Sequence, residues 1–265
     1  MRRFLVIALA LWPAAAAAWE PDGVEVDLEL VLAVDVSRSM SADELETQRR
    51  GYAEALRSPE VIGAIEGGLL GRIALTYVEW AGQYSQRSAV EWTLIDGPEA
   101  AHAFADRIGA HLEPGMRRTS ISGALLYSAT LFERNGFDGL RRVVDISGDG
   151  PNNQGRPVPM ARDSVLSRGI TINGLPLMTP EDRLQVWDIA DLDVYYENCV
   201  IGGPGAFVVP VVGWDQFGDA VRRKMVLEIA DRLPERLWRA QAPGAYDCLV
   251  GEKIWERYRS YWGEP

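Results

Sequence analysis

Short apolar runs alternate with amphipathic segments through most of this chain, and the alternation restricts the folds it can adopt. The run at 28–34 is almost wholly apolar apart from Glu29, which is typical of a buried strand, and 42–56 has the spacing of a helix with one apolar face. Strand and helix patterns continue to alternate as far as residue 233. This order predicts an α/β fold, doubly wound around a mainly parallel central sheet with helices on both faces.

The predicted elements make one domain over 24–233, followed by an extension over 234–265 that we expect to pack on the domain. At 47% hydrophobic residues, the chain has enough apolar material for one core of this size. The segment 88–95 alternates polar and apolar residues after a turn-like stretch, which predicts one antiparallel edge strand. Strands are predicted at 28–34, 72–80, 88–95, 141–147, 170–175 and 207–212, and helices at 42–56, 60–66, 98–112, 122–132, 159–168, 180–197 and 214–233.

Three oxygen-bearing side chains stand at alternate positions where the first strand ends: Asp35, Ser37 and Ser39. The carboxyl ends of strands in an open α/β sheet are where such folds hold their ligands. Carboxylate and hydroxyl oxygens suit a hard divalent cation such as Mg²⁺. The alternative is that these residues only cap the following helix.

Two later segments add oxygen ligands on the same predicted edge. Thr119 stands directly before a helical pattern, and Asp149 lies in an Asp-Gly turn after the strand at 141–147. A helix cap at Ser39 or Ser41 would explain neither segment, whereas convergence of all three segments on one sheet edge explains them together.

The pattern Asp35-x-Ser37-x-Ser39, then Thr119, then Asp149-Gly resembles the metal-ion-dependent adhesion site of von Willebrand factor type A (vWA) domains. The resemblance covers about 24–233, and the stretch 201–210 is similar to an exported bacterial subfamily described only as a domain of unknown function. It implies a Rossmann-like vWA fold with those five residues around a divalent cation, Mg²⁺ first and Mn²⁺ or Ca²⁺ as alternatives. The chain departs from the family pattern at Arg38, where many members have Gly, and at Gly148, which replaces the Thr of Thr-Asp-Gly.

Further polar and aromatic residues are predicted to surround this site and to contact a protein partner. Aromatic side chains and arginines often anchor protein interfaces, and cationic groups would attract an acidic partner. Tryptophans wedged against loops and arginines paired with nearby acids are the alternatives. The predicted rim consists of Arg38, Trp80, Arg117, Arg118, Asn152 and Trp214.

The N-terminus has the basic, apolar and small-residue regions of a secretory signal over 1–18, so we expect an exported protein, periplasmic or extracellular. The alternative is an uncleaved anchor, although Pro13 interrupts an apolar stretch that is short for a membrane span. Cys199 and Cys248 are the two cysteines, and export favours a disulfide between them over two free thiols.

The full chain has 27 basic and 38 acidic residues, and loss of Arg2 and Arg3 with the signal would make its net charge still more negative than −11. An acidic chain without a long basic cluster argues against nucleic acid as a partner. After signal cleavage, no segment remains that would span a membrane.

The predicted function is a metal-dependent protein-binding module of the cell envelope, in which a carboxylate of the partner completes the cation's ligands. No evident nucleophile accompanies the site, so we expect no enzyme activity. One alternative is a phosphohydrolase with Asp35 as nucleophile, although Ser37 stands where a second acid would be needed. The other is a structural envelope protein whose site holds no ion.

Overall fold

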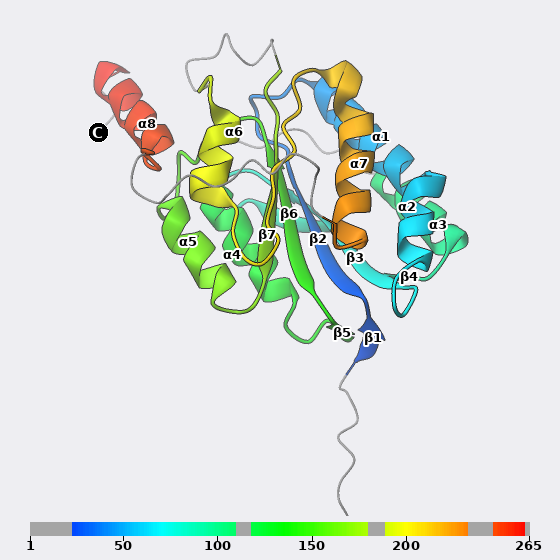
Figure 1. The fold of residues 1–265 in the computed structure, drawn as a ribbon. Helices are drawn as coiled ribbons and strands as arrows, with labels where there is room; N and C mark the ends of the chain where they lie inside the picture. Colours follow the sequence, from blue (N-terminus) through cyan, green and yellow to red (C-terminus); the bar gives the residue numbers. More distant parts are fainter. Residues whose placement is uncertain (1–22, 110–117, 180–188, 233–245, 263–265) are drawn as a thin grey trace, which may run out of the picture.

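The computed structural model describes residues 23–109, 118–179, 189–232 and 246–262. A five-stranded central sheet has the order β4-β3-β2-β6-β7, and all neighbouring strands are parallel except β3 and β4 (Figure 1). A second, two-stranded parallel sheet, β1 with β5, lies at the opposite end from the carboxyl ends of the central strands. The strands are β1 (Val24–Val26), β2 (Leu28–Asp35), β3 (Ile73–Trp80), β4 (Gln86–Ile95), β5 (Phe137–Gly139), β6 (Arg142–Gly148) and β7 (Thr171–Pro176).

Helices cover both faces of the central sheet, which confirms the predicted α/β architecture with one antiparallel edge strand. One face packs against α1 (Ala42–Arg57), α2 (Pro59–Glu66), α3 (Pro98–Gly109) and α7 (Phe217–Ile229), the last preceded by a 3₁₀ turn at Trp214–Gln216. The other face packs against α4 (Ile121–Leu131), α5 (Val158–Leu166) and α6 (Leu192–Tyr195), which continues as a π-helix over Tyr196–Val200.

The two faces follow from the period-two geometry of each strand. On β2, Leu30 and Leu32 join the apolar cluster under α1 and α7, whereas Val31 and Ala33 join the cluster under α4 and α6. The same alternation places Asp35, the last residue of β2, on the α4 and α6 side. All eight residues of β2 are buried, which explains why its sequence is a nearly continuous apolar run.

One predicted element differs from the structure. Residues 207–212 run parallel to β7 but form only isolated bridges, between Gly174 and Val208 and between Leu177 and Val211. Pro210 has no backbone N–H to donate, so this segment cannot form a continuous ladder. Of the helix predicted at 180–197, residues 180–188 lie outside the described part of the chain.

The described part of the C-terminal extension contacts the domain at the carboxyl end of β6. A disulfide joins Cys199, in the π-helix, to Cys248, with 5.5 Å between the two Cα atoms. Helix α8 (Val250–Trp262) follows and lies outside α6 (Figure 1). Asn152 Nδ2 donates a hydrogen bond to Oε1 of Glu252 at 2.7 Å. Among the described residues, none of the helices has the length and apolarity needed to cross a membrane.

Candidate metal centre

Asp35 places a buried carboxylate at the end of the central strand. Its Oδ1 accepts a hydrogen bond from the backbone N–H of Ser37 at 2.7 Å, and its carbonyl accepts one from Gln48 Nε2 at 2.8 Å. Oδ2 is buried and has no hydrogen-bond partner within the described segments. Burial and the nearby Asp149 carboxylate hold the pKa of Asp35 well above its usual range. A cation would offset both of these costs.

Ser37 and Ser39 bring their hydroxyls together in the turn after β2. The two Oγ atoms lie 2.8 Å apart, and Ser37 is buried. The cap of α1 is a different residue: Ser41 Oγ accepts from the N–H of Glu44, and the Glu44 side chain accepts from the N–H of Ser41. This capping box serves the helix end without either earlier serine, so capping does not account for Ser37 and Ser39.

Asp149 follows β6 directly, next to β2 in the sheet, and lies close enough to Asp35 for the two charges to interact. The preceding residue, Gly148, is one of the two departures from the vWA pattern, the other being Arg38. A Cβ at this position would lie 3.0 Å from Asp35 Oδ2 and 3.0 Å from the Tyr196 hydroxyl oxygen. A threonine here would therefore crowd both oxygens, which explains the glycine.

Thr119 is buried on the same edge, in a loop that backbone contacts fix. Its N–H donates to Asn153 Oδ1 at 3.1 Å, and its carbonyl accepts from the N–H of Asn153 at 2.9 Å. The next residue, Ser120, donates its N–H to the carbonyl of Ala81, which follows β3. The loop is thus tied both to the segment after Asp149 and to the end of the strand beside Asp35.

Trp80 and Asn152 were predicted to belong to the partner-binding rim. The prediction is wrong for both, because both are completely buried. Trp80 is the last residue of β3, where the strand was predicted to end, and its position in the alternation turns its ring into the apolar cluster under α4. Asn152 is held by protein contacts, since its Oδ1 accepts from the N–H of Ser122 and its Nδ2 reaches Glu252. Neither side chain is available to a partner.

The other predicted rim residues lie in different settings. Arg38 is exposed in the turn between Ser37 and Ser39. Arg118 is half-buried, and its guanidinium lies over the ring of Trp255 in α8. Trp214 is half-buried and donates Nε1–H to Glu44 Oε1 at 2.9 Å, so it packs beside the start of α1. Arg117 lies outside the described residues.

Sequence reasoning missed Tyr84, whose side chain is 89% exposed in the turn after β3. The turn is fixed by backbone contacts between Ala81 and Ser85 and by Gln86 Nε2, which donates to the carbonyl of Gly82. An exposed aromatic side chain on a rigid turn beside the polar edge is suited to contact a partner. Its polar neighbours gave no periodic signal that would have distinguished it from an ordinary turn residue.

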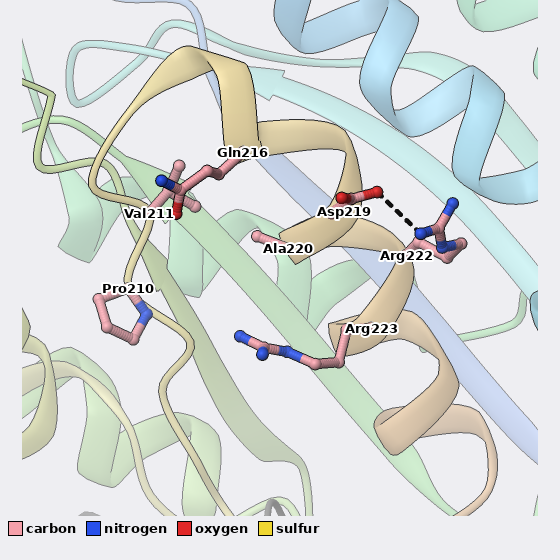
Figure 2. Close-up of a pocket in the computed structure, with 7 residues that line it drawn as sticks. All are labelled: Pro210, Val211, Gln216, Asp219, Ala220, Arg222 and Arg223. Carbon is pink, nitrogen blue, oxygen red and sulfur yellow. Dashed lines mark hydrogen bonds and ion pairs between the residues drawn. The ribbon is translucent and has the colours of Figure 1, made fainter.

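A separate hollow of about 340 Å³ lies between α7 and the segment beside β7 (Figure 2). Figure 2 shows Arg223 extending toward Pro210, while Arg222 pairs with Asp219 at 2.8 Å. The hollow contains none of the five predicted ligands. Among the described residues, no group of three or more His, Cys, Asp and Glu side chains is placed to hold a metal ion. The candidate centre has two carboxylates, Asp35 and Asp149, and its other predicted ligands are hydroxyls.

Comparison with protein families assigns the chain to one family. A family model described as "Protein of unknown function (DUF1194)" matches residues 25–233, well over half of the sequence. The chain belongs to the DUF1194 family. The family match spans all five predicted ligands of this DUF1194 chain. A search of curated proteins found nothing that matches it.

Solved structures show that this DUF1194 domain has the vWA fold. Proximal thread matrix protein 1 from the mussel byssus matches with a TM-score of 0.57 and 13% identity over 79% of this chain and 49% of its own. The pilus adhesin SpaC from Lactobacillus rhamnosus GG matches with a TM-score of 0.55 and 12% identity, over 78% and 30%. A von Willebrand factor type A protein from Catenulispora acidiphila matches with a TM-score of 0.52 and 10% identity, over 77% and 43%.

These identities establish the fold and nothing finer. The DUF1194 chain spans about half the length of the mussel protein and less of the other two. A further structure of the mussel protein, with a TM-score of 0.54 and 14% identity over 79% of this chain and 49% of that one, has a zinc-occupied metal-ion-dependent adhesion motif.

Proposed function

We propose that this protein is a metal-dependent protein-binding module of the cell envelope. The observation that carries the proposal is the buried pair of carboxylates, Asp35 and Asp149, at the carboxyl ends of neighbouring strands. Two buried like charges are unfavourable without a cation between or beside them. The hydroxyls of Ser37, Ser39 and Thr119 would supply the remaining protein ligands, and Mg²⁺ is the ion that such a set of oxygens suits first.

The partner in this proposal presents an exposed Asp or Glu. Three of the five protein ligands are neutral hydroxyls, so the ion keeps enough positive character to accept one more hard oxygen. Arg38 is exposed within the turn that carries both serines, where its charge would favour the approach of an acidic group. The vWA neighbour with zinc in its adhesion motif supports a divalent cation at such an edge.

We further propose that the protein is exported, to the periplasm or beyond the cell, and that it is not an enzyme. The disulfide between Cys199 and Cys248 supports an oxidising compartment. In a phosphohydrolase Asp35 would be the nucleophile, and the residue two positions later would have to act as acid or base. That residue is Ser37, which donates its backbone N–H to Asp35 and whose hydroxyl does not have a pKa suited to proton transfer. Hydrolysis of simple phosphate esters that is lost in Asp35→Asn would favour the enzyme instead.

The first experiment is a titration of the purified protein with Mg²⁺ and Mn²⁺, followed by melting temperature and calorimetry. An ion that binds only the folded state should raise the melting temperature by mass action. Asp35→Asn, which keeps the shape and removes the charge, should abolish this rise. Asp215→Asn changes an exposed acid and serves as the control. Identical responses of Asp35→Asn and the unchanged protein would reject the site.

The second experiment tests the partner. A protein captured from envelope extract should be released by chelator, and Thr119→Ala should weaken its capture strongly in the presence of the ion. Thr130→Ala, which alters an exposed threonine on α4, is the matched control. Arg38→Ala should weaken capture modestly and mainly at low salt, and we expect the same of Arg117→Ala. Capture that survives both chelation and Thr119→Ala would place recognition elsewhere.

A further inference from the structure

Two glycines on neighbouring strands make room for one aromatic side chain beside the candidate metal centre. A Cβ at Gly174, in β7, would lie 2.7 Å from Cδ1 of Tyr196, and a Cβ at Gly148, at the end of β6, would lie 3.0 Å from its hydroxyl oxygen. The register pairs Ile146 with Gly174, so both glycines face the α6 side of the sheet. The ring of Tyr196 therefore lies along the two glycines with its hydroxyl at the polar edge.

The hydroxyl of Tyr196 faces the same point as an oxygen of Asp35. Both atoms lie 3.0 Å from the position that a Cβ at 148 would take, so the two oxygens are at most about 6 Å apart, a separation that one bridging water can span. Both atoms are buried, and in the described part of the chain neither has a hydrogen-bond partner. A buried polar atom without a hydrogen-bond partner destabilises the folded state. Two such atoms close together therefore call for an explanation, such as a bound group that both of them contact.

The contact lies in an unusual stretch of backbone. Tyr196 begins the π-helix that runs to Val200, and π-helical turns often occur at functional sites. Tyr52 and Tyr77 also have buried hydroxyls without a partner among the described residues, but their rings pack in the cluster on the opposite face of the sheet. Of these three tyrosines, Tyr196 is the one whose hydroxyl lies near Asp35.

We propose that Tyr196 is a positioning residue of the metal centre, whose hydroxyl shares a buried water with Oδ2 of Asp35 and so fixes that carboxylate toward the cation. The inference rests on the proposed function. Groups that orient a metal ligand typically change metal affinity by about 10- to 100-fold when removed. Gly148 belongs to the same device, because a side chain there would separate the hydroxyl from Asp35.

The test is Tyr196→Phe, with Tyr195→Phe as the matched control. Both tyrosines are buried and adjacent, but the Tyr195 hydroxyl accepts a hydrogen bond from the backbone N–H of Asn152 at 3.2 Å. The measurements are the dissociation constant for Mn²⁺ by calorimetry and the melting temperature without metal. Tyr196→Phe should weaken Mn²⁺ binding about tenfold or more while the metal-free melting temperature stays the same or rises. Tyr195→Phe should lower the metal-free melting temperature and leave the Mn²⁺ dissociation constant unchanged.

The outcomes separate this inference from the proposed function. If the unchanged protein binds Mn²⁺ and Tyr196→Phe binds it equally well, the positioning role is wrong and the metal centre stands. A Tyr196→Phe variant that loses affinity only together with its metal-free melting temperature shows a purely structural tyrosine and also overturns the inference. If the unchanged protein binds neither Mn²⁺ nor Mg²⁺, both proposals fail.

Discussion

The guanidinium of Arg118 lies over the ring of Trp255, with 3.5 Å between its central carbon and the ring centroid. Arg118 directly precedes Thr119 and has a positive φ of 78°, a backbone conformation that non-glycine residues adopt at some cost. The contact joins the C-terminal helix to the loop that carries one predicted metal ligand. Helix α8 is therefore part of the surroundings of the candidate centre.

Trp255→Leu should weaken the attachment of α8, because it removes the cation–π contact with Arg118. Such contacts contribute about 0.5–1 kcal/mol at exposed sites. Leucine is chosen because it keeps an apolar side chain at this position. The expected result is faster hydrogen exchange in α8 and in the loop at 118–120. Arg259→Ala, on an exposed position of the same helix, should change neither. Unchanged exchange at 118–120 in Trp255→Leu would show that α8 does not steady this loop.

Reduction of the disulfide should destabilise the protein. The bond closes a loop with a sequence separation of 49 residues. In the chain-entropy model, a loop of this size contributes about 4 kcal/mol to the free energy of unfolding. Urea unfolding of the oxidised protein, compared with the Cys199→Ala, Cys248→Ala double variant, measures the difference. Thiol counting on the purified protein under denaturing, non-reducing conditions should find no free thiol. Two free thiols would show that the disulfide does not form.

Gly174→Ala should destabilise the protein because the added Cβ would lie 2.7 Å from the Tyr196 ring. Overpacking of this kind typically costs about 1–3 kcal/mol. Gly63→Ala is the matched control, since a Cβ there meets nothing within 4 Å and lies in α2. That change should stabilise by up to about 1 kcal/mol through helix propensity. Equal effects of the two changes in urea unfolding would mean that the glycine at 174 is not needed to seat Tyr196.

Stability should fall with rising pH through a buried acid on the other face of the sheet. Burial, together with the Asp145 carboxylate, raises the pKa of Glu228 to about 7, although Lys224 and Asn173 oppose the shift. The pKa of Glu228 in the folded protein lies above the usual value of 4.5. The contribution of this carboxyl group to the free energy of unfolding is therefore fully present below pH 4.5 and is lost as the pH rises through about 7. Glu228→Gln should flatten this dependence in urea unfolding between about pH 5 and 8. Parallel pH profiles would contradict the assignment.

The strand pattern was enough to predict the fold and the position of Asp35, because a buried parallel strand has an almost continuous apolar sequence and the site begins where that run ends. The same reasoning failed at Trp80. The strand was predicted to end at this residue, as it does, but the alternation along β3 turns the ring inward, and the rim prediction did not take the face of the sheet into account.

The surroundings of residues whose partners are distant in sequence could not be predicted. Asn152 was expected at an exposed rim, but Glu252, a hundred residues later, covers it. Tyr196 gave no signal, since the glycines that seat it lie on two other strands. Local sequence reports which face a residue occupies, whereas these assignments depend on which elements become neighbours in the sheet and around it.

The disulfide also determines how the molecule would bear a mechanical load. A pull on α8 reaches Cys248 and passes through the covalent bond to Cys199, on the α6 side of the sheet. The chain between the two cysteines, which includes α7 on the opposite face, carries none of that tension while the bond is intact. A molecule pulled through its C-terminal helix would therefore keep α7 packed on the sheet under a force that could otherwise detach it.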